Sequence, residues 1–415
     1  MVSRPLASYA PSEAVGVQVR AEGGLTERER RLIDAAGLWA RAPIEAWSVM
    51  GSNKQLAYLT HGVFRFFGKF PPPIARRLID EFTAPGEWVV DPMCGSGTTA
   101  VEALALARHV VARDVSPLSG LLCGVKTTHV PEAQALEALA RVQQRFGRSP
   151  RGALPGPVGL RNADHWFLPQ TVTSLGRIRV AIDPEAEGPV RNLLLAAFAS
   201  TVRRVSRATT QQGRLFLDAA KASTDAWPTF AARLRTYAAA VQALPRRWST
   251  RARFELLDAR ARPARPRSFG LAIVHPPYFN NYRYSSINSL ELAWLGMAPR
   301  EVHKGEIREA FKLGHAAKVG DYVEDLAAAV SSLAAQVKGT LALMMGDTII
   351  RGDYVPVTRR LLDQLQTERV PLRLQRLVLR VPRYTEASWV ASQRRTGDQL
   401  GVALNDFILI FGRTA

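Results

Sequence analysis

The feature that most constrains the fold of this chain is the stretch at residues 87–114, EWVVDPMCGSGTTAVEALALARHVVARD. An apolar run ends at a carboxylate and a glycine-rich loop, an alanine-rich helical stretch follows, and a second apolar run ends in another carboxylate. This order predicts a strand, a tight loop, a helix and a parallel strand, which together form a βαβ unit of about 30 residues. Parallel strands need helices on the faces of their sheet, so this unit requires an α/β architecture.

Strand and helix patterns alternate again in the second half of the chain. Apolar runs at 252–258 and 269–274 precede a helical stretch at 322–338. A strand-like run, a helix at 355–366 and two more strand-like runs follow, the last at 406–412. This alternation predicts an α/β fold whose doubly wound, mainly parallel sheet is covered by helices on both faces.

The same patterns divide the chain into four parts. Residues 60–129 hold the first part of the sheet domain with the glycine loop, and residues 251–415 hold the second part. Residues 130–250 are mostly helical in pattern and are expected to be an insertion into that domain. Residues 1–59 are expected to form a partly helical N-terminal extension.

Two features describe that extension. Residues 1–24 are small and polar without periodicity, so we expect them to be poorly ordered. Residues 26–39 fit a capped helix, because Thr26 is followed three positions later by Glu29.

The charge of the chain is strongly positive. Its 55 Lys and Arg against 36 Asp and Glu give +19, and this balance favours a polyanionic partner such as nucleic acid. Residues 131–270 carry 23 basic against 10 acidic side chains, a net of 23 − 10 = +13. The insertion is therefore the first candidate for a phosphate-facing surface, although an arginine-rich composition alone produces such surfaces too.

Several classes of protein are disfavoured by the sequence. No apolar run approaches the roughly 20 residues of a membrane helix, and the first residues lack the pattern of a secretory signal. The two cysteines, Cys94 and Cys123, cannot make a disulfide framework or a zinc ligand set. No clustered His and Cys pattern implies a catalytic metal. We expect a cytoplasmic protein without a membrane or metal partner; its oligomeric state stays open.

The loop DPMCGSGTT at residues 91–99 is the first candidate binding site. Glycines directly after a strand let a ligand approach the backbone, and the following helix N-terminus favours an anionic group. The loop lacks the lysine of a phosphate-binding P-loop and the third glycine of a dinucleotide fingerprint, which disfavours ATP and GTP. By itself the turn does not identify a ligand.

Two more carboxylates extend this candidate site. Asp114 ends the second strand, where a carboxylate usually holds a ribose diol in folds of this kind. Asp258 ends the third predicted strand and could contact the rim of an adenine. Each could also be an ordinary solvated acid, but three strand-end features in order favour a nucleoside-containing ligand.

The apolar run at 269–274 ends abruptly in His275, Pro276, Pro277 and Tyr278. Two prolines cannot continue a central strand, because each lacks the N–H that the sheet needs. The tetrapeptide therefore fixes a rigid strand end, and rigidity at such a position is typical of a preorganised site.

These motifs resemble those of the amino-group DNA methyltransferases that use S-adenosylmethionine. The family's cofactor loop is similar to DPFCGSGTT, from which this chain departs only at Met93. Its catalytic tetrapeptide, Asp, Ser or Asn followed by Pro-Pro and an aromatic residue, is similar to HPPY at 275–278. Residues 60–79 resemble the segment that helps to hold the methionine end of the cofactor, and 114–118 resemble its ribose-binding turn.

The resemblance covers residues 60–128 and 252–296. It implies a methyltransferase fold, S-adenosylmethionine as cofactor and double-stranded DNA as partner, with the insertion as the candidate target-recognition part. Neutralising Arg203, Arg204 and Arg207 there is expected to weaken DNA binding and its salt dependence. The resemblance places these residues at the cofactor: Lys69, Phe70, Pro71, Asp91, Pro92, Cys94, Gly95, Ser96, Gly97, Thr98, Asp114, Ser116 and Asp258.

The resemblance also implies the chemistry. An exocyclic amine on a base is a poor nucleophile, because its lone pair is delocalised into the ring. Two acceptors that take its N–H bonds free that lone pair; they correspond here to the His275 side chain and the Pro276 carbonyl. Pro277 keeps the turn rigid, and Tyr278 stacks on a base flipped out of the duplex.

His275 departs from the family pattern. A neutral imidazole accepts one hydrogen bond and a protonated one accepts none, so activity is expected to fall below the pKa of His275. A rate that is flat from pH 5.5 to 8 would argue against this role. The alternative is that HPPY marks a slow, degenerate site, which replacement of His275 by Ser or Asp would reveal as a gain of rate.

The segment after the prolines is the candidate substrate contact, and its residues are Phe279, Asn280, Asn281, Tyr282 and Arg283. All could equally shape a loop. Cytosine N4 is favoured over adenine N6 as the target, because the acceptor is small and neutral. An RNA base methyltransferase and a non-catalytic DNA-binding relative remain as rivals. No nuclease motif is present, so a restriction partner would be a separate protein, and the recognition sequence stays open.

Overall fold

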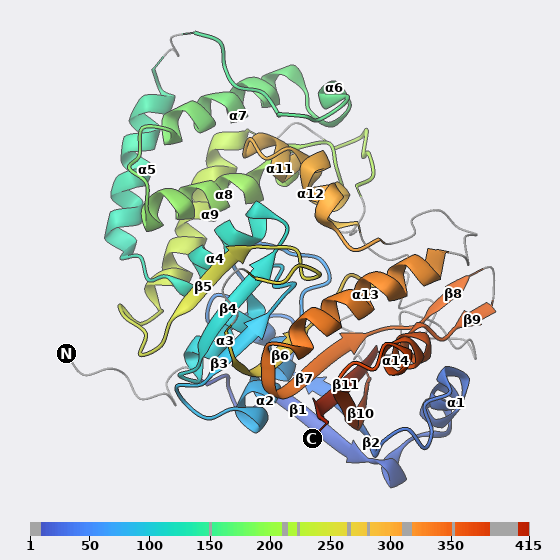
Figure 1. Cartoon of the computed structure of the whole chain (residues 1–415). Helices are drawn as coiled ribbons and strands as arrows, with labels where there is room; N and C mark the ends of the chain where they lie inside the picture. The colour runs from blue at the N-terminus through green and yellow to red at the C-terminus, as the bar shows by residue number, and fades with distance from the viewer. Residues whose placement is uncertain are drawn as a thin grey trace.

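The computed structural model describes residues 10–148, 152–209, 215–221, 225–263, 267–279, 283–308, 318–350, 353–381 and 406–414 (Figure 1). Its strands are β1 (Gly16–Ala21), β2 (Ile44–Met50), β3 (Trp88–Asp91), β4 (His109–Asp114), β5 (Ala252–Leu256), β6 (Phe269–Val274), β7 (Val337–Met345), β8 (Thr348–Ile350), β9 (Asp353–Val355), β10 (Leu372–Arg380) and β11 (Asp406–Arg413).

Its helices are α1 (Glu27–Ala36), α2 (Pro72–Phe82), α3 (Thr98–Ala105), α4 (Pro117–Thr127), α5 (Glu132–Phe146), α6 (Ala163–Trp166), α7 (Pro169–Ile182), α8 (Pro189–Val205), α9 (Ala226–Gln242), α10 (Tyr284–Ile287), α11 (Ser289–Trp294), α12 (Pro299–Gly305), α13 (Lys318–Ala334) and α14 (Val357–Thr367). Short 3₁₀ helices lie at Glu22–Gly24 and Gln55–Ala57.

Across the described residues, one large sheet has the order β1-β2-β10-β11-β7-β6-β3-β4-β5. The pairs from β7 through β6, β3 and β4 to β5 are parallel, as is β10 with β2. Antiparallel pairs join β1 to β2 and join β11 to both β10 and β7. The expected doubly wound, mainly parallel sheet is confirmed.

The strand order locates the place where a ligand can bind. From β3 the chain moves outward to β4 and β5, then returns to add β6 on the other side of β3. The strand order therefore reverses between β3 and β6, and the chain leaves these two strands toward opposite faces of the sheet. At such a reversal a crevice forms outside the carboxyl ends of the two strands. The glycine loop follows β3 and the HPPY tetrapeptide follows β6, which brings the two motifs to the same edge of the sheet.

Alternating residues of the central strands build two cores. Val89 and Leu271 pack with α2 and α3 on one face of the sheet. Val90 and Ala272 pack with α13 and α14 on the other face. Successive strand side chains point to opposite faces, so the short run WVV of β3 contributes to both layers. This two-sided burial is why the central strands are continuous apolar runs rather than alternating ones.

Helices α5, α7, α8 and α9 pack together on a third core, above the β4 and β5 end of the sheet (Figure 1). Residues of α4, α11 and α12 join the same core. Phe167 is buried there and Trp166 packs against it, so both serve the packing of this helical block. Helices α11 and α12 follow β6 in the chain, so this helical block also contacts the second part of the sheet domain.

The N-terminal extension differs from expectation. Residues 16–24 are not poorly ordered: β1 pairs along its whole length with β2. Strand β2, which the sequence patterns did not predict, pairs in parallel with β10 and extends the sheet. Helix α1 begins at the expected capping box of Thr26 and Glu29 but ends at Ala36, because Gly37 adopts a left-handed conformation with φ of 65°.

Two smaller points complete the fold. Strand β5 ends at Leu256, so Asp258 lies two residues beyond its end rather than at it. In the described part of the chain, no helix combines the length and the apolar character that a membrane crossing requires.

Candidate active site

A pocket with about 900 Å³ of empty space, partly open to solvent, lies at the carboxyl ends of β3, β4 and β6. The predicted site residues that line it are Lys69, Phe70, Asp91, Pro92, Cys94, Gly95, Ser96, Thr98, Asp114, Ser116, Asp258, His275 and Pro277. Segments far apart in the sequence therefore meet at one site. The predicted residues Pro71, Gly97, Pro276, Tyr278, Phe279 and Arg283 do not line the pocket.

The glycine loop forms one wall. Gly95 and Gly97 have φ of 49° and 79°, in the left-handed region that favours glycine. A Cβ on Gly95 would lie 3.0 Å from the Phe66 ring, and one on Gly97 would lie 3.1 Å from the Cα of Cys123. Larger residues at either position would push the loop away from its neighbours, so the two glycines set how closely the loop can approach a ligand.

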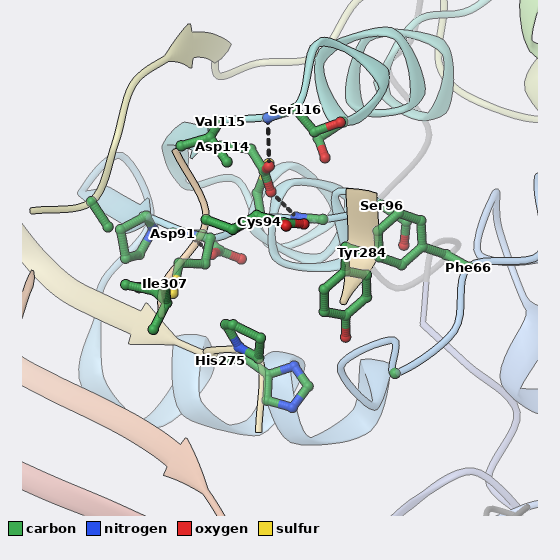
Figure 2. A pocket seen from close by; sticks show the side chains of 18 of the residues that line it. Phe66, Asp91, Cys94, Ser96, Asp114, Val115, Ser116, His275, Tyr284 and Ile307 are labelled. Carbon is green, nitrogen blue, oxygen red and sulfur yellow. Dashed lines mark hydrogen bonds between the residues drawn. The ribbon is translucent and has the colours of Figure 1, made fainter. Parts of the chain in front are cut away.

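Asp114 fixes this loop from the end of β4. Its carboxylate accepts a hydrogen bond from the Gly95 N–H at 2.9 Å and another from the Ser116 N–H at 2.9 Å, the two dashed lines of Figure 2. Burial nevertheless raises its pKa, because the charged form loses water. One carboxylate thus joins two turns that both line the pocket.

Asp91 is the second buried carboxylate of this wall. It accepts a hydrogen bond from the Met93 N–H at 3.1 Å. Burial, with a contribution from the charge of Asp114, raises its pKa to about 7. The pocket wall therefore gains negative charge as the pH rises through neutrality.

Two polar atoms of the wall lack a partner. The hydroxyl groups of Ser96 and Thr98 are buried and form no hydrogen bond within the described structure. Buried polar groups are normally hydrogen-bonded. Polar groups of a ligand could satisfy both, so the glycine-loop wall fits a polar, nucleoside-containing cofactor such as S-adenosylmethionine.

Asp258 lines the pocket but is already paired. Arg260 donates to its carboxylate from Nε at 2.9 Å and from Nη2 at 2.5 Å. The same guanidinium bonds to Asp325 on α13 at 2.9 Å. This chain of charges, which the sequence did not indicate, holds the loop after β5 against α13.

The segment before α2 forms a strap across the pocket; we use this name for residues 60–70. Lys69 donates to the His61 carbonyl at 3.0 Å, and burial lowers the pKa of its ammonium group to about 8. Phe66 stacks on Tyr284, with ring centroids 5.5 Å apart. Pro71 sits at the start of α2 and sets the direction of that helix rather than touching the pocket.

His275 lies across the pocket from Asp114 (Figure 2). Its ring packs near Phe70, 5.2 Å between centroids, and edge-on to Tyr278 at 5.4 Å. Burial, helped by the positive charge of Arg380, lowers the pKa of the imidazole to about 3. The ring forms no hydrogen bond to any residue of the described structure, so its acceptor nitrogen remains available to a ligand.

This pKa changes the expected pH dependence. A group whose neutral form is active loses activity only as the pH falls through its pKa. For His275 that point lies near pH 3, so the rate is expected to be flat from pH 5.5 to 8. A flat profile therefore does not argue against His275, as it would for a histidine with an ordinary pKa.

The prolines are held from behind. The Tyr322 hydroxyl on α13 donates to the Pro277 carbonyl at 2.7 Å, a contact that the sequence did not predict. Tyr278 lies with its ring against Gly346, where a Cβ would meet it at 3.3 Å. Its ring is thus packed at the end of β7 and not in the pocket lining, and its stacking role stays a prediction.

The segment after the prolines contributes to the site differently from expectation. Phe279 is buried against Tyr322, with ring centroids 5.5 Å apart, and belongs to the core. Arg283 precedes α10, and the predicted contacts Asn280, Asn281 and Tyr282 lie outside the described residues.

The pocket wall on this side comes instead from Tyr284, Asn288 and residues 302–307. Glu306 joins its parts, because its carboxylate accepts hydrogen bonds from the Ser285 N–H at 2.6 Å and the Ser285 hydroxyl at 2.7 Å. The aromatic residue at position 284 was the one sequence signal that could have indicated this wall.

The three arginines singled out for DNA binding have different environments. Arg203 is only 7% exposed and donates to the Ile287 carbonyl at 3.2 Å, so its neutralisation would first disturb packing. Arg204 is exposed and Arg207 is half-buried. Arg203 is therefore too buried to contact a phosphate directly, and the effect of neutralising Arg204 and Arg207 on DNA binding stays a prediction. Within the described residues, no group of His, Cys, Asp and Glu side chains could hold a metal ion.

Comparison with known proteins matches the part of the chain that contains the glycine loop. Residues 27–117 match the family described as DNA methylase. The chain is 24% identical over 201 residues to Type II methyltransferase M.MvaI of Kocuria varians, covering 46% of this chain and 44% of that protein. It is 31% identical over 75 residues to Type II methyltransferase M.MjaII of Methanocaldococcus jannaschii, covering 18% and 14%. The chain thus matches less than half the length of either relative.

Among solved structures, the rRNA methyltransferase aviRa from Streptomyces viridochromogenes is 15% identical and has a TM-score of 0.26. The alignment covers 68% of this chain and 76% of that one. The fold described above rests on the strand order of this chain itself.

Proposed function

Because this chain belongs to the family of amino-group DNA methyltransferases, we propose that it methylates an exocyclic amino group in double-stranded DNA, with S-adenosylmethionine as the methyl donor. The proposed target is cytosine N4 in preference to adenine N6. The observation that carries the proposal is the position of His275: a neutral imidazole at the end of β6 faces the glycine-loop wall across one pocket.

The glycine-loop wall would hold the cofactor. Asp114, which lines the pocket, would hold a ribose diol, and the unpartnered hydroxyl groups of Ser96 and Thr98 would bind polar groups of the ligand. The carboxylate of Asp91 would favour the positively charged end of the cofactor above its pKa of about 7. When bound, S-adenosylmethionine would supply an electrophilic methyl group: the electron pair of its carbon–sulfur bond passes to sulfur as the new carbon–nitrogen bond forms.

The proline wall would activate the base. The unprotonated nitrogen of His275 accepts one N–H of the exocyclic amine. The Pro276 carbonyl is proposed to accept the other, although Pro276 does not line the pocket before substrate binds. Both interactions draw the nitrogen toward tetrahedral geometry and localise its lone pair. Acceptors that are fixed in advance cost no rearrangement during the reaction, which is the main source of electrostatic catalysis.

The methylated nitrogen must then lose a proton. A neutral His275 already holds a hydrogen bond to that nitrogen and can take the proton before passing it to water. A protonated imidazole could neither accept the hydrogen bond nor take the proton. Both steps therefore need the neutral imidazole that the pocket maintains, and a pKa of about 3 means that His275 passes the proton on to water at once.

The preference for cytosine N4 rests on the same residue. In the resembled family, serine at this position leans toward cytosine and aspartate toward adenine. His275 matches neither, but it presents a neutral acceptor as serine does, whereas aspartate presents an anion. Tyr278 is proposed to stack on the flipped base, which requires its ring to leave the Gly346 side when substrate binds. The helical block around α8 and α9 is proposed as the target-recognition part, beside the pocket and rich in arginine.

Two measurements test the proposed function. Nucleosides from the DNA of cells that express the protein are expected to contain N4-methylcytosine by mass spectrometry, and cells with the empty vector none. Purified protein is expected to transfer labelled methyl groups to duplex DNA and not to tRNA. Detection of N6-methyladenine instead would show that the target base is adenine. Transfer to tRNA alone would show that the substrate is RNA and not DNA. No transfer to either would show that the protein is a non-catalytic relative.

The curated relatives carry the name Type II methyltransferase. By this likeness we propose that the protein methylates one short recognition sequence, as the modification partner of a separate restriction endonuclease. Sequencing that detects modified bases in the same expressing cells is expected to find the methyl groups at a single motif.

A further inference from the structure

The strap is attached to the helical block through stacked cations. The ring of Phe67 has the guanidinium carbon of Arg65 5.0 Å from its centroid and that of Arg203 4.8 Å from it. Arg65 belongs to the strap, and Arg203 belongs to the last turn of α8. Two positive charges therefore share one aromatic ring at the joint, an arrangement that orients both side chains.

Two more elements bring cations to the same place. The Phe64 N–H donates to the Tyr237 hydroxyl on α9 at 2.9 Å, which fixes the strap against that helix. Arg233 lies one turn before Tyr237 and so shares its face of α9. Lys221 is anchored at the end of α8 by a hydrogen bond to the Ala208 carbonyl at 2.9 Å.

Three cations of this group, Arg204, Lys221 and Arg233, have few compensating charges near them. Burial lowers the pKa of Arg204, and the neighbouring charges of Arg233 and Arg65 lower it further. Burial also lowers the pKa of Lys221, which Arg203 and Arg204 lower further and Asp218 opposes. In the described structure, Arg204, Arg233 and Lys221 form no ion pair with a carboxylate.

Clustered cations repel one another, and an anionic partner relieves that repulsion. The location limits what the partner can be. Arg65 is adjacent in sequence to Phe66, which lines the pocket, so the strap end of the group lies beside the pocket. A strand whose base enters the pocket must place its phosphates near the pocket.

We propose that Arg65, Arg204, Lys221 and Arg233, which we name the strap cluster, bind the backbone phosphates of duplex DNA beside the flipped base. This inference rests on the proposed function, because it takes DNA as the substrate. Arg203 acts behind the cluster: it is buried and positions Phe67. The strap would thus link the cofactor pocket to the DNA surface of the helical block.

The test is the salt dependence of DNA binding in the double variant Arg65→Gln/Arg204→Gln. Both side chains are exposed, so the variant is expected to fold. The slope of log affinity against log salt should become shallower by about 2, because each lost phosphate contact removes about 0.9. Measurement by fluorescence anisotropy uses a labelled duplex, the full-length protein and the cofactor product.

Two controls make the result specific. Arg65→Lys/Arg204→Lys keeps the charges and should keep most of the slope. Arg360→Gln/Arg373→Gln removes two exposed arginines on α14 and β10, neither of which lines the pocket, and should leave the slope unchanged. Calorimetric binding of S-adenosylmethionine and the melting temperature check that each variant is folded.

An unchanged slope in the glutamine variant, while the wild-type protein methylates DNA, would overturn the strap cluster and leave the proposed function standing. A shallower slope in the glutamine variant, with no methyl transfer by the wild-type protein, would support the strap cluster as a DNA contact and overturn the proposed function. Tighter binding of tRNA than of duplex, with the same slope change on tRNA, would contradict DNA as the partner of the cluster.

Discussion

The two walls of the pocket handle their polar groups in opposite ways. On the glycine-loop wall, the Asp114 carboxylate is engaged by two backbone N–H groups of the protein. On the proline wall, the half-buried His275 imidazole forms no hydrogen bond to the described residues and is held neutral. The first wall is shaped in advance for a constant ligand. The second keeps its acceptor for the group that reacts.

This contrast predicts that each wall can be damaged separately. The largest effect is expected from His275→Ala, which removes an acceptor from the proline wall. The rate of methyl transfer in a single turnover should fall by about 10²- to 10³-fold, the usual cost of removing one preorganised hydrogen-bonding group. Cofactor affinity, measured by calorimetry, should stay within about twofold because the glycine-loop wall is untouched.

The matched variants of this position are His275→Asn and His275→Ser. Both supply a neutral acceptor and should recover part of the rate lost in His275→Ala. A rate higher than that of the wild-type protein would show instead that the histidine marks a degenerate site.

The second effect is expected at Asp114. Asp114→Ala leaves the N–H groups of Gly95 and Ser116 without their acceptor. Each unsatisfied group costs about 1–3 kcal/mol of folding stability. The affinity for S-adenosylmethionine should fall by about 100-fold, while transfer at saturating cofactor changes far less. Asp114→Asn keeps one acceptor oxygen, so its affinity for S-adenosylmethionine should lie between those of the wild-type protein and the alanine variant. If the alanine variant bound the cofactor normally, the assignment of this wall would be wrong.

The smallest effect is expected at Tyr322. Tyr322→Phe removes the donor to the Pro277 carbonyl and loosens the proline turn without touching the substrate. The rate should fall by about 2- to 10-fold, in line with the loss of one hydrogen bond. The KM for cofactor should not change.

Tyr354→Phe is the control for Tyr322, because Tyr354 donates a hydrogen bond to Asp347 outside the pocket lining. It should lower the melting temperature but leave the rate unchanged. Equal rate losses in the two variants would mean that Tyr322 acts only through stability.

The sequence predicted the part of the site that short-range structure determines. The loop at 91–99 combines an apolar strand, two glycines and a helix start within a few residues, so its shape follows from local conformational preference. The rigid end of β6 follows in the same way from two prolines. Strand order then brings both to one edge of the sheet, as the alternation of strands and helices predicted.

The sequence did not predict contacts that depend on distant partners. Arg260 bonds to Asp325 because α13 and the loop after β5 meet in space, and Tyr322 reaches Pro277 from 45 residues away. Strand β2 was missed because its pairing with β10, over 300 residues later, decides its conformation rather than its own pattern. Arg203 looked like a surface charge but is enclosed by the strap and α10.

The central claim is that His275 is a neutral acceptor, and a nitrogen-15 NMR titration of its imidazole tests that claim most directly. The spectrum is recorded from pH 8 to 4 with saturating cofactor, and His275→Ala identifies the signals of this ring. We predict that the ring stays neutral across the whole range, in accord with a pKa of about 3, and that duplex DNA shifts its acceptor nitrogen. Protonation near pH 6.5, or no response to DNA, would contradict the account.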